Sequence, residues 1–483
     1  MKTHQLLIAG EARSATANAT FQRMNPLSGQ VVTDAAAASI ADANAAVDAA
    51  SVAFETWSDS SVGERRRLLL KAADLMESYK DAFIKCMVEE TGSTPTWAGF
   101  NVMVAAGVLR EAASLTSQIG GDIIPSNVPD SLAMGIRVPC GVVVGIAPWN
   151  APIILATRAI ATPIACGNTV ILKASEQCPA THHLIGQVLI EAGLGNGIVN
   201  VITNAPKDAA DVVGALIDAP AVRRINFTGS TAVGRIIAER AARHLKPVLL
   251  ELGGKAPFIV LEDADIDAAV EAAAFGAFFN QGQICMSTER LIVVESVADE
   301  FAQKLAAKAA TLKAGDPLDT SNALGTLIAA EAGEKLNGLL ADALAKGASL
   351  LSGGKAEGVV MPATLIDNVT SQMRIYTEES FGPMVAMMRV KNEEEAICIA
   401  NDSEYGLSAA VFSKDLARAM KVAKRIESGI CHINAPTVHD EPQMPFGGVK
   451  SSGYGRFGGK YGIEEFTELR WMTVQMGPRH YPI

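Results

Sequence analysis

Short β-rich runs alternate with helical runs from about residue 141 onward, and this alternation restricts the chain to an α/β fold. Five strands are predicted before residue 252: Val142–Ile146, Thr169–Lys173, Val199–Ile202, Arg224–Phe227 and Val248–Glu251. Helical patterns lie between them, near 151–165, 179–192, 208–217 and 231–243. Strands that alternate with helices form βαβ units, in which the strands lie parallel in one sheet.

A second series of the same kind follows. The predicted strands are Phe258–Leu261, Leu291–Val294, Val385–Val390, Ala409–Phe412 and Ile430–Ile433, and the helices lie near 265–279, 297–313, 329–346, 392–400 and 415–427. Upstream, 39–58 and 63–91 also carry apolar residues at helical spacing. A chain of 483 residues is long enough for two α/β domains with a cleft between them.

Charge and cysteine content exclude several classes of protein. A net charge of -11 argues against a nucleic-acid or anionic-membrane surface. The apolar run at the N-terminus is too short for a signal peptide, and prolines interrupt the apolar region 138–172, so we expect no membrane partner. Seven scattered cysteines without a CxxC pair favour a reduced, cytoplasmic compartment. Histidines are also scattered, and we expect no metal.

Cys285 is the candidate nucleophile. It follows a polar segment that contains Gly282, and a glycine lets the backbone approach a reacting carbon closely. A thiol attacks only as the thiolate, which needs a polar or electropositive and partly open site. The alternative is a buried structural thiol, and from Cys285 alone the two interpretations are about equally probable.

Two residues upstream could assist this cysteine. Glu251 ends an apolar strand, where partial desolvation raises the pKa of a carboxylate and suits it to general-base work. The alternative is a structural salt bridge, for example with Lys255. Asn150 lies between a predicted strand and a helix, where its amide could donate to an oxyanion. The alternative is that Asn150 caps the helix.

A glycine turn suggests a phosphate site. Gly229, Ser230 and Thr231 lie between a strand and a helix, where backbone N–H groups can face phosphate. The motif is not GxGxxG, so a plain tight turn is an equally good interpretation. Lys173 and Glu176 lie just past another strand, at the end where ligands bind in such sheets. An acidic residue there accepts ribose hydroxyls and repels a 2′-phosphate, which favours NAD over NADP.

The ordered set of motifs, from Pro148-Trp149-Asn150 to Pro445-Phe446-Gly447-Gly448, resembles the NAD(P)-dependent aldehyde dehydrogenase superfamily over essentially the whole chain. The resemblance implies that Cys285 is the nucleophile, Glu251 the general base and Asn150 the oxyanion-hole amide. It implies that NAD is held by Ile146, Pro148, Trp149, Lys173, Ser175, Glu176, Gly229, Ser230, Thr231, Glu379 and Phe381. Glu468 matches a glutamate sometimes assigned to proton relay.

Within the superfamily, the chain looks closest to bacterial salicylaldehyde dehydrogenases of naphthalene catabolism, and benzaldehyde and vanillin enzymes are near neighbours. The family's layout places Trp97, Arg158, Met286 and Phe446 around the substrate, and an apolar, aromatic pocket suits a flat ring. Arg158 could meet a phenolic oxygen, but an arginine on a helix more often pairs with a carboxylate. We therefore expect oxidation of salicylaldehyde to salicylate. Benzaldehyde, vanillin or aliphatic substrates, a cofactor-independent cysteine hydrolase and a non-catalytic protein of this fold are the alternatives.

Glu251 also indicates the product. Members of the family that transfer the acyl group to coenzyme A generally lack this glutamate, so its presence favours hydrolysis to a free acid.

The resemblance implies that the chain is divided into three parts. A Rossmann-like NAD-binding domain takes 1–120, 142–251 and 450–464, an α/β catalytic domain takes 252–449, and a small β excursion takes 121–141 and 465–483. The excursion implies self-association as a homodimer or a dimer of dimers, through a strand near Phe466–Val474.

Overall fold

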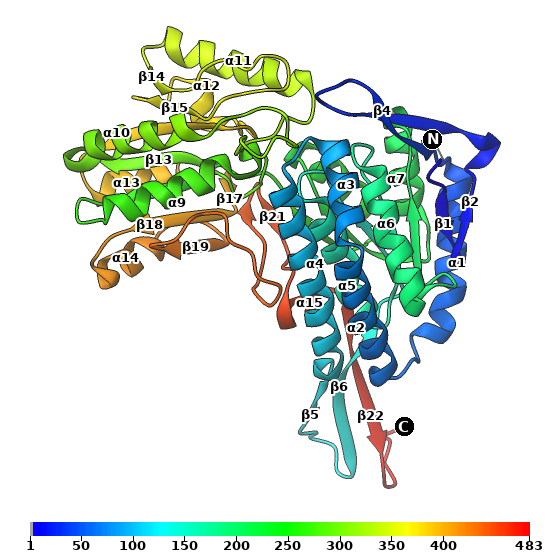
Figure 1. The fold of residues 1–483 in the computed structure, drawn as a ribbon. Helices are drawn as coiled ribbons and strands as arrows, with labels where there is room; N and C mark the ends of the chain where they lie inside the picture. Colours follow the sequence, from blue (N-terminus) through cyan, green and yellow to red (C-terminus); the bar gives the residue numbers. More distant parts are fainter. Residues whose placement is uncertain (1–2) are drawn as a thin grey trace.

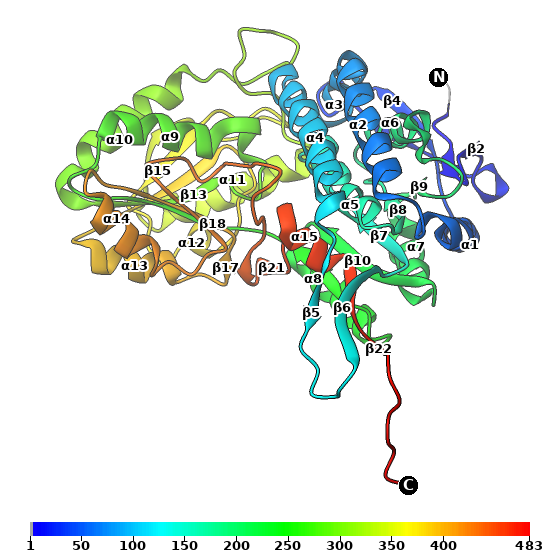
Figure 2. The same cartoon turned by 90° about the horizontal axis from the view of Figure 1, so that it is seen from below.

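Two helix-covered sheets lie side by side, and a narrow third sheet projects away from both of them (Figures 1 and 2). The structure is a computed structural model that describes residues 3–483. The architecture is the α/β fold that the alternation of strands and helices predicts.

The first sheet has the strand order β2-β1-β9-β8-β7-β10-β11-β21. Its parallel centre consists of β7 (Val142–Ile146), β8 (Thr169–Lys173), β9 (Val199–Ile202), β10 (Val222–Thr228) and β11 (Val248–Glu251). Antiparallel strands complete both edges: β1 (Leu6–Ile8) and β2 (Glu11–Arg13) on one side, and β21 (Gly453–Tyr454) on the other. The central strands are buried on both faces, which explains their nearly continuous Val, Ile and Leu content.

Helices cover both faces of this sheet. One apolar core joins one face to α2 (Val62–Ser78), α3 (Lys80–Thr91), α4 (Pro95–Leu115), α5 (Pro152–Ala165) and α6 (Pro179–Leu189). A second core joins the other face to α1 (Ile40–Trp57), α7 (Ala209–Asp218) and α8 (Thr231–Ala242). The predicted helical segment 63–91 is interrupted at Tyr79, whose backbone leaves the helical conformation. Helix α4 was not predicted, although Thr94 caps its first turn and Pro95 opens it.

The second sheet has the order β14-β15-β16-β13-β12-β18-β19. Its strands are β12 (Ala256–Val260), β13 (Thr288–Val294), β14 (Ser349–Ser352), β15 (Thr364–Asp367), β16 (Met384–Val390), β18 (Ser408–Phe412) and β19 (Ile430–Ile433). All neighbours are parallel except β14 and β15. The helices on its two faces are α9 (Ile266–Phe278) and α10 (Glu295–Thr311) on one, and α11 (Ala330–Ala345), α13 (Glu393–Asn401) and α14 (Leu416–Ala423) on the other. Strands β14 and β15 were not predicted.

The projecting sheet has three antiparallel strands in the order β22-β6-β5, and it extends below the two sheets in Figure 1. They are β5 (Gly121–Ile124), β6 (Ser131–Pro139) and β22 (Thr467–Gln475). Strand β22 is an edge strand that exposes Leu469 and Trp471, the latter at 80%. No helix between residues 3 and 483 is long and apolar enough to cross a membrane.

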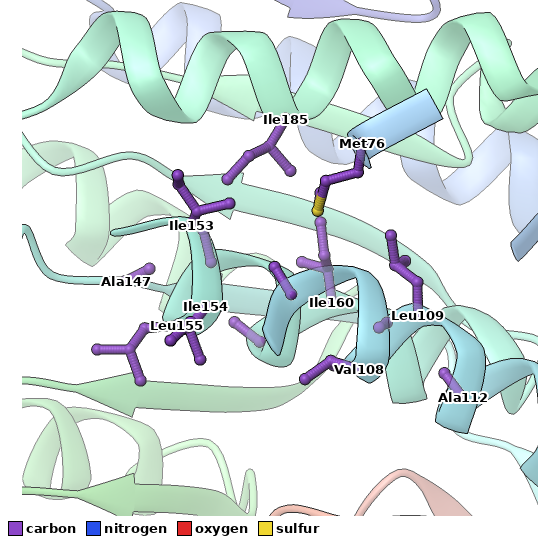
Figure 3. Packing of buried hydrophobic residues seen from close by; sticks show 14 of the residues in the cluster. Met76, Val108, Leu109, Ala112, Ala147, Ile153, Ile154, Leu155, Ile160 and Ile185 are labelled. Atoms are coloured by element: carbon purple, nitrogen blue, oxygen red, sulfur yellow. The ribbon is translucent and has the colours of Figure 1, made fainter. Parts of the chain in front are cut away.

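Helix α5 supports the loop that carries Asn150. All of its residues are buried, and Ile153 and Ile160 face a core that Met76 of α2, Leu109 of α4 and Ile185 of α6 complete (Figure 3). A helix enclosed on all sides by apolar side chains is held in a single position. The loop that precedes α5, which carries Asn150, therefore begins from a rigid support.

Candidate active site

Two cavities meet at Cys285 and Asn150, and both residues line both of them. The first, which we call the apolar cavity, has a volume of about 260 Å³. The second, which we call the polar cavity, has a volume of about 210 Å³ and lies at the carboxyl ends of β7, β10 and β11. A molecule in either cavity would therefore have access to the Cys285 thiol.

The loop that precedes Cys285 has an unusual backbone. Three consecutive residues, Asn280, Gln281 and Gly282, adopt positive φ angles of 49°, 56° and 66°. Side-chain amides hold this shape: Asn280 Nδ2 donates to the Asn150 carbonyl (3.1 Å), and Gln281 Nε2 donates to Thr326 O (3.0 Å). A Cβ on Gly282 would lie 2.1 Å from the Gly382 carbonyl oxygen, so only glycine fits there. The close contact at Gly282 is thus with the backbone of Gly382, and approach to a reacting carbon stays a prediction.

Asn150 has a fixed side chain. Its Nδ2 donates to the Gln283 carbonyl (3.0 Å), and its own carbonyl accepts from Trp97 Nε1 (2.9 Å). Helix α5 begins after Ala151, so the alternative that Asn150 caps this helix is wrong. One hydrogen of the amide is engaged by Gln283, and the amide has a second hydrogen to donate.

Glu251 ends β11 and is only 1% exposed. By distance and angle, neither of its carboxylate oxygens has a hydrogen-bond partner among residues 3–483, but the Cys285 thiol is close enough to influence its pKa. Burial raises the pKa of Glu251 to about 8, so the predicted upward shift is confirmed. The alternative ion pair with Lys255 is wrong, because Lys255 Nζ donates to Glu289 Oε2 (2.6 Å).

The thiol and the carboxylate influence each other. Burial raises the pKa of the Cys285 thiol well above its usual value, and the Glu251 carboxylate adds to the rise. Both groups favour their neutral forms at neutral pH, so the thiol proton can pass to Glu251 only when that residue is in its carboxylate form.

Aromatic and acidic side chains form the far wall of the polar cavity. The rings of Trp149 and Phe381 meet edge to face, with their centres 5.7 Å apart. Glu379 accepts a hydrogen bond from the Gly254 N–H (3.0 Å), and burial raises its pKa to about 7. Pro148, Gly229 and Ser230 also line this cavity, so it contains most of the predicted cofactor residues.

The other predicted cofactor residues lie outside the lining of the polar cavity, at the same edge of the sheet. Ile146 and Lys173 are paired at the ends of neighbouring strands. The Lys173 ammonium pairs with Glu176 and lowers the pKa of that carboxyl although burial opposes the change. The Ser175 N–H donates to the buried ring of His182 (3.0 Å).

The glycine turn is arranged differently from the prediction. The Gly229 N–H donates to the Glu251 carbonyl (3.0 Å), so this group is already occupied. Ser230 caps helix α8, and the Thr231 hydroxyl donates to Ser451 O (3.1 Å). An anion at this turn would therefore bind the N–H groups of the first turn of α8, where the helix dipole also favours it.

The apolar cavity is lined by aromatic rings. Trp97 stacks on Phe100 with ring centres 5.5 Å apart, and both rings meet Phe279 edge to face. Phe275 stacks on Phe279 at 4.8 Å and is 42% exposed, so the series of rings runs from the surface toward Cys285. All four predicted substrate residues, Trp97, Arg158, Met286 and Phe446, line this cavity.

Arg158 brings a charge into this apolar surrounding. It pairs with the Asp440 carboxylate, with Nη2 2.6 Å from Oδ1, so the predicted pairing with a carboxylate is confirmed. Its guanidinium carbon lies 4.5 Å from the centre of the Phe446 ring, within the range of a cation–π contact. Its Nη1 is buried and has no hydrogen-bond partner in the described part of the chain.

Glu468 lies outside the lining of both cavities. It is on β22, opposite Val138, and its half-exposed carboxylate pairs with Arg224 (3.0 Å).

The sequence analysis missed several residues that line the apolar cavity: Phe100, Ile154, Leu155, Phe275, Phe279, Val438, His439 and Asp440. The spacings Trp97–Phe100 and Phe275–Phe279, which bring two rings together on a helix or at its end, are local signals that could have indicated part of this wall. Among residues 3–483, no three His, Cys, Asp or Glu side chains are grouped so that they could hold a metal ion.

The model of the aldehyde dehydrogenase family matches residues 13–472, so the chain belongs to this family. Its members are NAD-binding dehydrogenases, and solved relatives include betaine aldehyde dehydrogenase from Staphylococcus aureus in complex with NAD+, at 32% identity and a TM-score of 0.95 over 99% of this chain and 96% of that one.

Two further relatives are more similar. A vanillin dehydrogenase of a Pseudomonas species is 63% identical over 99% of both chains. The crystal structure of a salicylaldehyde dehydrogenase from Pseudomonas putida G7, complexed with salicylaldehyde, matches all of both chains with a TM-score of 0.98 and 52% identity. Oxidation of an aldehyde by a nicotinamide cofactor is thus the reaction class of this chain.

Proposed function

We propose that this enzyme oxidises an aromatic aldehyde that carries a ring hydroxyl to the free carboxylic acid, with NAD as the cofactor. One observation carries the proposal: a cavity lined by aromatic rings and a cavity with the features of a nicotinamide site share Cys285 and Asn150. An aldehyde carbon at the junction would be accessible to the thiol from one side and to a cofactor from the other.

The first step is attack of the Cys285 thiolate on the aldehyde carbon. Glu251, which is close enough to raise the pKa of the thiol, takes up the thiol proton. A carbon–sulfur bond forms, and the carbonyl oxygen becomes an oxyanion. The second N–H of the Asn150 amide and the N–H of Cys285 donate to this oxyanion.

NAD fits the polar cavity on the chemistry of its walls. Glu379 offers a carboxylate to ribose hydroxyls, the Trp149 and Phe381 rings face the cavity, and the first turn of α8 suits a pyrophosphate. When bound, NAD supplies the hydride acceptor for the oxidation. The chain's own residues orient the aldehyde and keep the acyl group on Cys285.

Hydrolysis of the thioester is assigned to Glu251. Glu251 first releases the thiol proton to solvent. As a carboxylate it then removes a proton from a water molecule, which attacks the acyl carbon while the carbon–sulfur bond breaks and Cys285 leaves as the thiolate. A pKa of about 8 is close to the operating pH, which is where a general base is most effective. The presence of Glu251 supports release of a free acid instead of transfer of the acyl group to a thiol such as coenzyme A.

The walls of the apolar cavity support a single aromatic ring as the substrate. About 260 Å³ is slightly below the usual range of ligand pockets, which suits a one-ring aldehyde. The unpartnered Nη1 of Arg158 would donate to an oxygen on that ring. Vanillin and salicylaldehyde, the substrates in the names of two relatives, both carry such an oxygen.

Between these two aldehydes, we favour vanillin over our sequence-based expectation of salicylaldehyde, because the vanillin enzyme is 63% identical and the salicylaldehyde enzyme 53%. A panel of vanillin, salicylaldehyde, benzaldehyde and hexanal, each assayed for NADH or NADPH formation, tests substrate class and cofactor together. We expect the highest kcat/KM for a phenolic aldehyde with NAD. Equal turnover of hexanal would refute the aromatic assignment, and no reduced cofactor with any aldehyde would favour a cysteine hydrolase.

We also propose that copies of this chain associate through β22 in a reducing, cytoplasmic compartment. The strand has a free edge and exposes Leu469, Trp471 and Val474. An exposed apolar edge strand is a template for pairing with another chain. A dimer is the smallest assembly that would cover it, and size-exclusion chromatography with light scattering measures its size.

A further inference from the structure

Three segments of the active site converge on one buried ion pair. Lys255 follows the turn after Glu251, Glu289 lies four residues beyond Cys285, and both side chains are at most 5% exposed. The third segment contains Glu379 and Phe381. The pair therefore joins the segments that carry the candidate base, the candidate nucleophile and the candidate cofactor wall.

Both oxygens of the Glu289 carboxylate are used. Oε1 accepts from the N–H groups of Ser380 (3.0 Å) and Phe381 (3.1 Å). Oε2 accepts from the Ser380 hydroxyl and from Lys255 Nζ (2.6 Å). A buried carboxylate with this many donors holds them in one geometry, because removal of any of them leaves charge unsatisfied in a medium of low dielectric constant.

The loop that Glu289 holds is strained. Phe381 has a φ of 53°, in the left-handed region that non-glycine residues seldom adopt. Such a conformation persists only where the surrounding structure imposes it, and it is concentrated at functional sites. Its N–H donates to Glu289, and its ring meets that of Trp149 edge to face in the wall of the polar cavity.

We propose that Glu289, fixed by Lys255, is a positioning residue for NAD: it holds Phe381 in its strained conformation, which keeps the ring and the neighbouring Glu379 against the cofactor. The inference rests on the proposed binding of NAD in the polar cavity. Lys255 fixes Glu289 through the ion pair, and the turn that contains Lys255 adds a second link, because the Gly254 N–H donates to Glu379 Oε1 (3.0 Å).

The test is the affinity for NAD alone, measured by isothermal titration calorimetry without an aldehyde, so that an error in the proposed substrate does not affect it. We expect Glu289→Gln to raise the Kd for NAD at least tenfold. The matched control is Glu378→Gln on the same loop, which breaks an exposed ion pair with Arg374 and should change the Kd less than twofold. Failure of the wild-type protein to bind NAD would overturn both the cofactor site and this inference.

A double variant, Lys255→Met with Glu289→Gln, separates positioning from simple loss of stability. It leaves no unpaired buried charge, so its thermal unfolding should lie closer to that of the wild type than that of Glu289→Gln does. Its Kd for NAD should stay raised, because one amide oxygen cannot replace two carboxylate oxygens. A double variant with wild-type affinity for NAD would overturn the proposal.

Strain at Phe381 gives a second, independent measurement. Glycine adopts a positive φ without cost, whereas alanine does not, and both lack the ring. We expect Glu289→Gln to raise the Kd for NAD at least fivefold in a Phe381→Ala background and less than twofold in a Phe381→Gly background. Equal effects in the two backgrounds would mean that Glu289 does not act by holding this conformation.

Discussion

Arg158 and Asp440 form an ion pair within the wall of the apolar cavity, with Arg158 Nη2 2.6 Å from Asp440 Oδ1. The two residues are 282 positions apart in the chain. The pair occupies one side of the guanidinium and leaves Nη1 without a partner in the described structure. A charged donor with an unused N–H in an apolar cavity favours a ligand that carries an oxygen on its ring.

Replacing Arg158 with methionine should therefore reduce selectivity for phenolic aldehydes. A hydrogen bond to a charged group contributes about 1.5–3 kcal/mol, so kcat/KM for vanillin or salicylaldehyde should fall at least about tenfold relative to benzaldehyde. Steady-state assays of the three aldehydes measure this ratio. Because Asp440 would be left unpaired, Arg158→Met with Asp440→Asn serves as the control for stability, and a parallel loss for benzaldehyde would contradict the assignment.

Removal of the thiol should abolish aldehyde oxidation. We expect Cys285→Ala to lower kcat by at least about 10⁴-fold, which is typical when a nucleophile is removed. The matched control is Cys398→Ala, since Cys398 is exposed and lies on α13, away from both cavities. The assay is NADH formation, with circular dichroism to verify folding. Substantial activity in Cys285→Ala would refute the covalent mechanism.

Glu251→Gln should slow both half-reactions, because the residue is assigned to take up the thiol proton and to activate the water. NADH should therefore form more slowly than in the wild type, as a burst of about one equivalent per active site, and then nearly stop because the thioester persists. In the wild type, only the carboxylate form is a base, so hydrolysis should slow about tenfold per pH unit below the pKa of about 8 and level off above it. Stopped-flow absorbance measures both effects, and a full steady-state rate in Glu251→Gln would assign hydrolysis to another residue.

The same carboxyl should destabilise the fold at high pH. Its pKa is raised from 4.5 in the unfolded chain to about 8 in the folded one, so folding favours the protonated form. Stability is therefore lost as pH rises from about 4.5 to 8, and Glu251→Gln should raise the unfolding temperature more at pH 8 than at pH 5. Scanning fluorimetry at both pH values measures this difference, and equal shifts would contradict a buried, unpaired Glu251.

Most central strands of the two sheets could be predicted closely because they are buried on both faces, although the equally buried β15 was missed. Val142–Ile146 and Thr169–Lys173 are continuous β-branched and apolar runs, and their bounds match the structure. Helix boundaries inside long amphipathic stretches were harder to predict, as the break at Tyr79 illustrates. Apolar periodicity continues across that break, and only the backbone turn interrupts the helix.

In the active site, the residues within sequence motifs could be predicted, but the residues that contact them from distant parts of the chain could not. Cys285, Glu251 and Asn150 stand in recognisable local segments, whereas Asp440 and Glu289 acquire their roles from distant contacts. Asp440 is opposite Arg158 only because a loop after β19 folds over α5. The turn at Gly229 also has a partner that the sequence does not show, since the pairing of β10 with β11 places the Gly229 N–H against the Glu251 carbonyl.

Cofactor preference should depend on Glu176. Its carboxylate is held by Lys173 and by Asn204 Nδ2 (3.0 Å), and it would repel the 2′-phosphate of NADP. Glu176→Gln keeps the size of the side chain and removes the charge, so kcat/KM for NADP should rise about tenfold, equivalent to about 1.4 kcal/mol. Assays with both cofactors measure this. The exposed Glu239→Gln on α8 is the control, and an unchanged NADP/NAD ratio in Glu176→Gln would place the discrimination elsewhere.

Assembly should depend on β22, because its outer edge has no neighbour in the described structure and it exposes the apolar side chains of Leu469, Trp471 and Val474. A charge in the middle of a paired strand costs desolvation, so Trp471→Glu should shift the protein toward the monomer. Truncation after Phe466 removes the strand and should give a monomeric or insoluble protein. The control is Leu318→Glu, which introduces the same charge at an exposed apolar residue, 69% accessible, in a loop of the other domain. Light scattering after size exclusion measures the mass, and a truncated chain that remains a dimer would show that another surface holds the copies together.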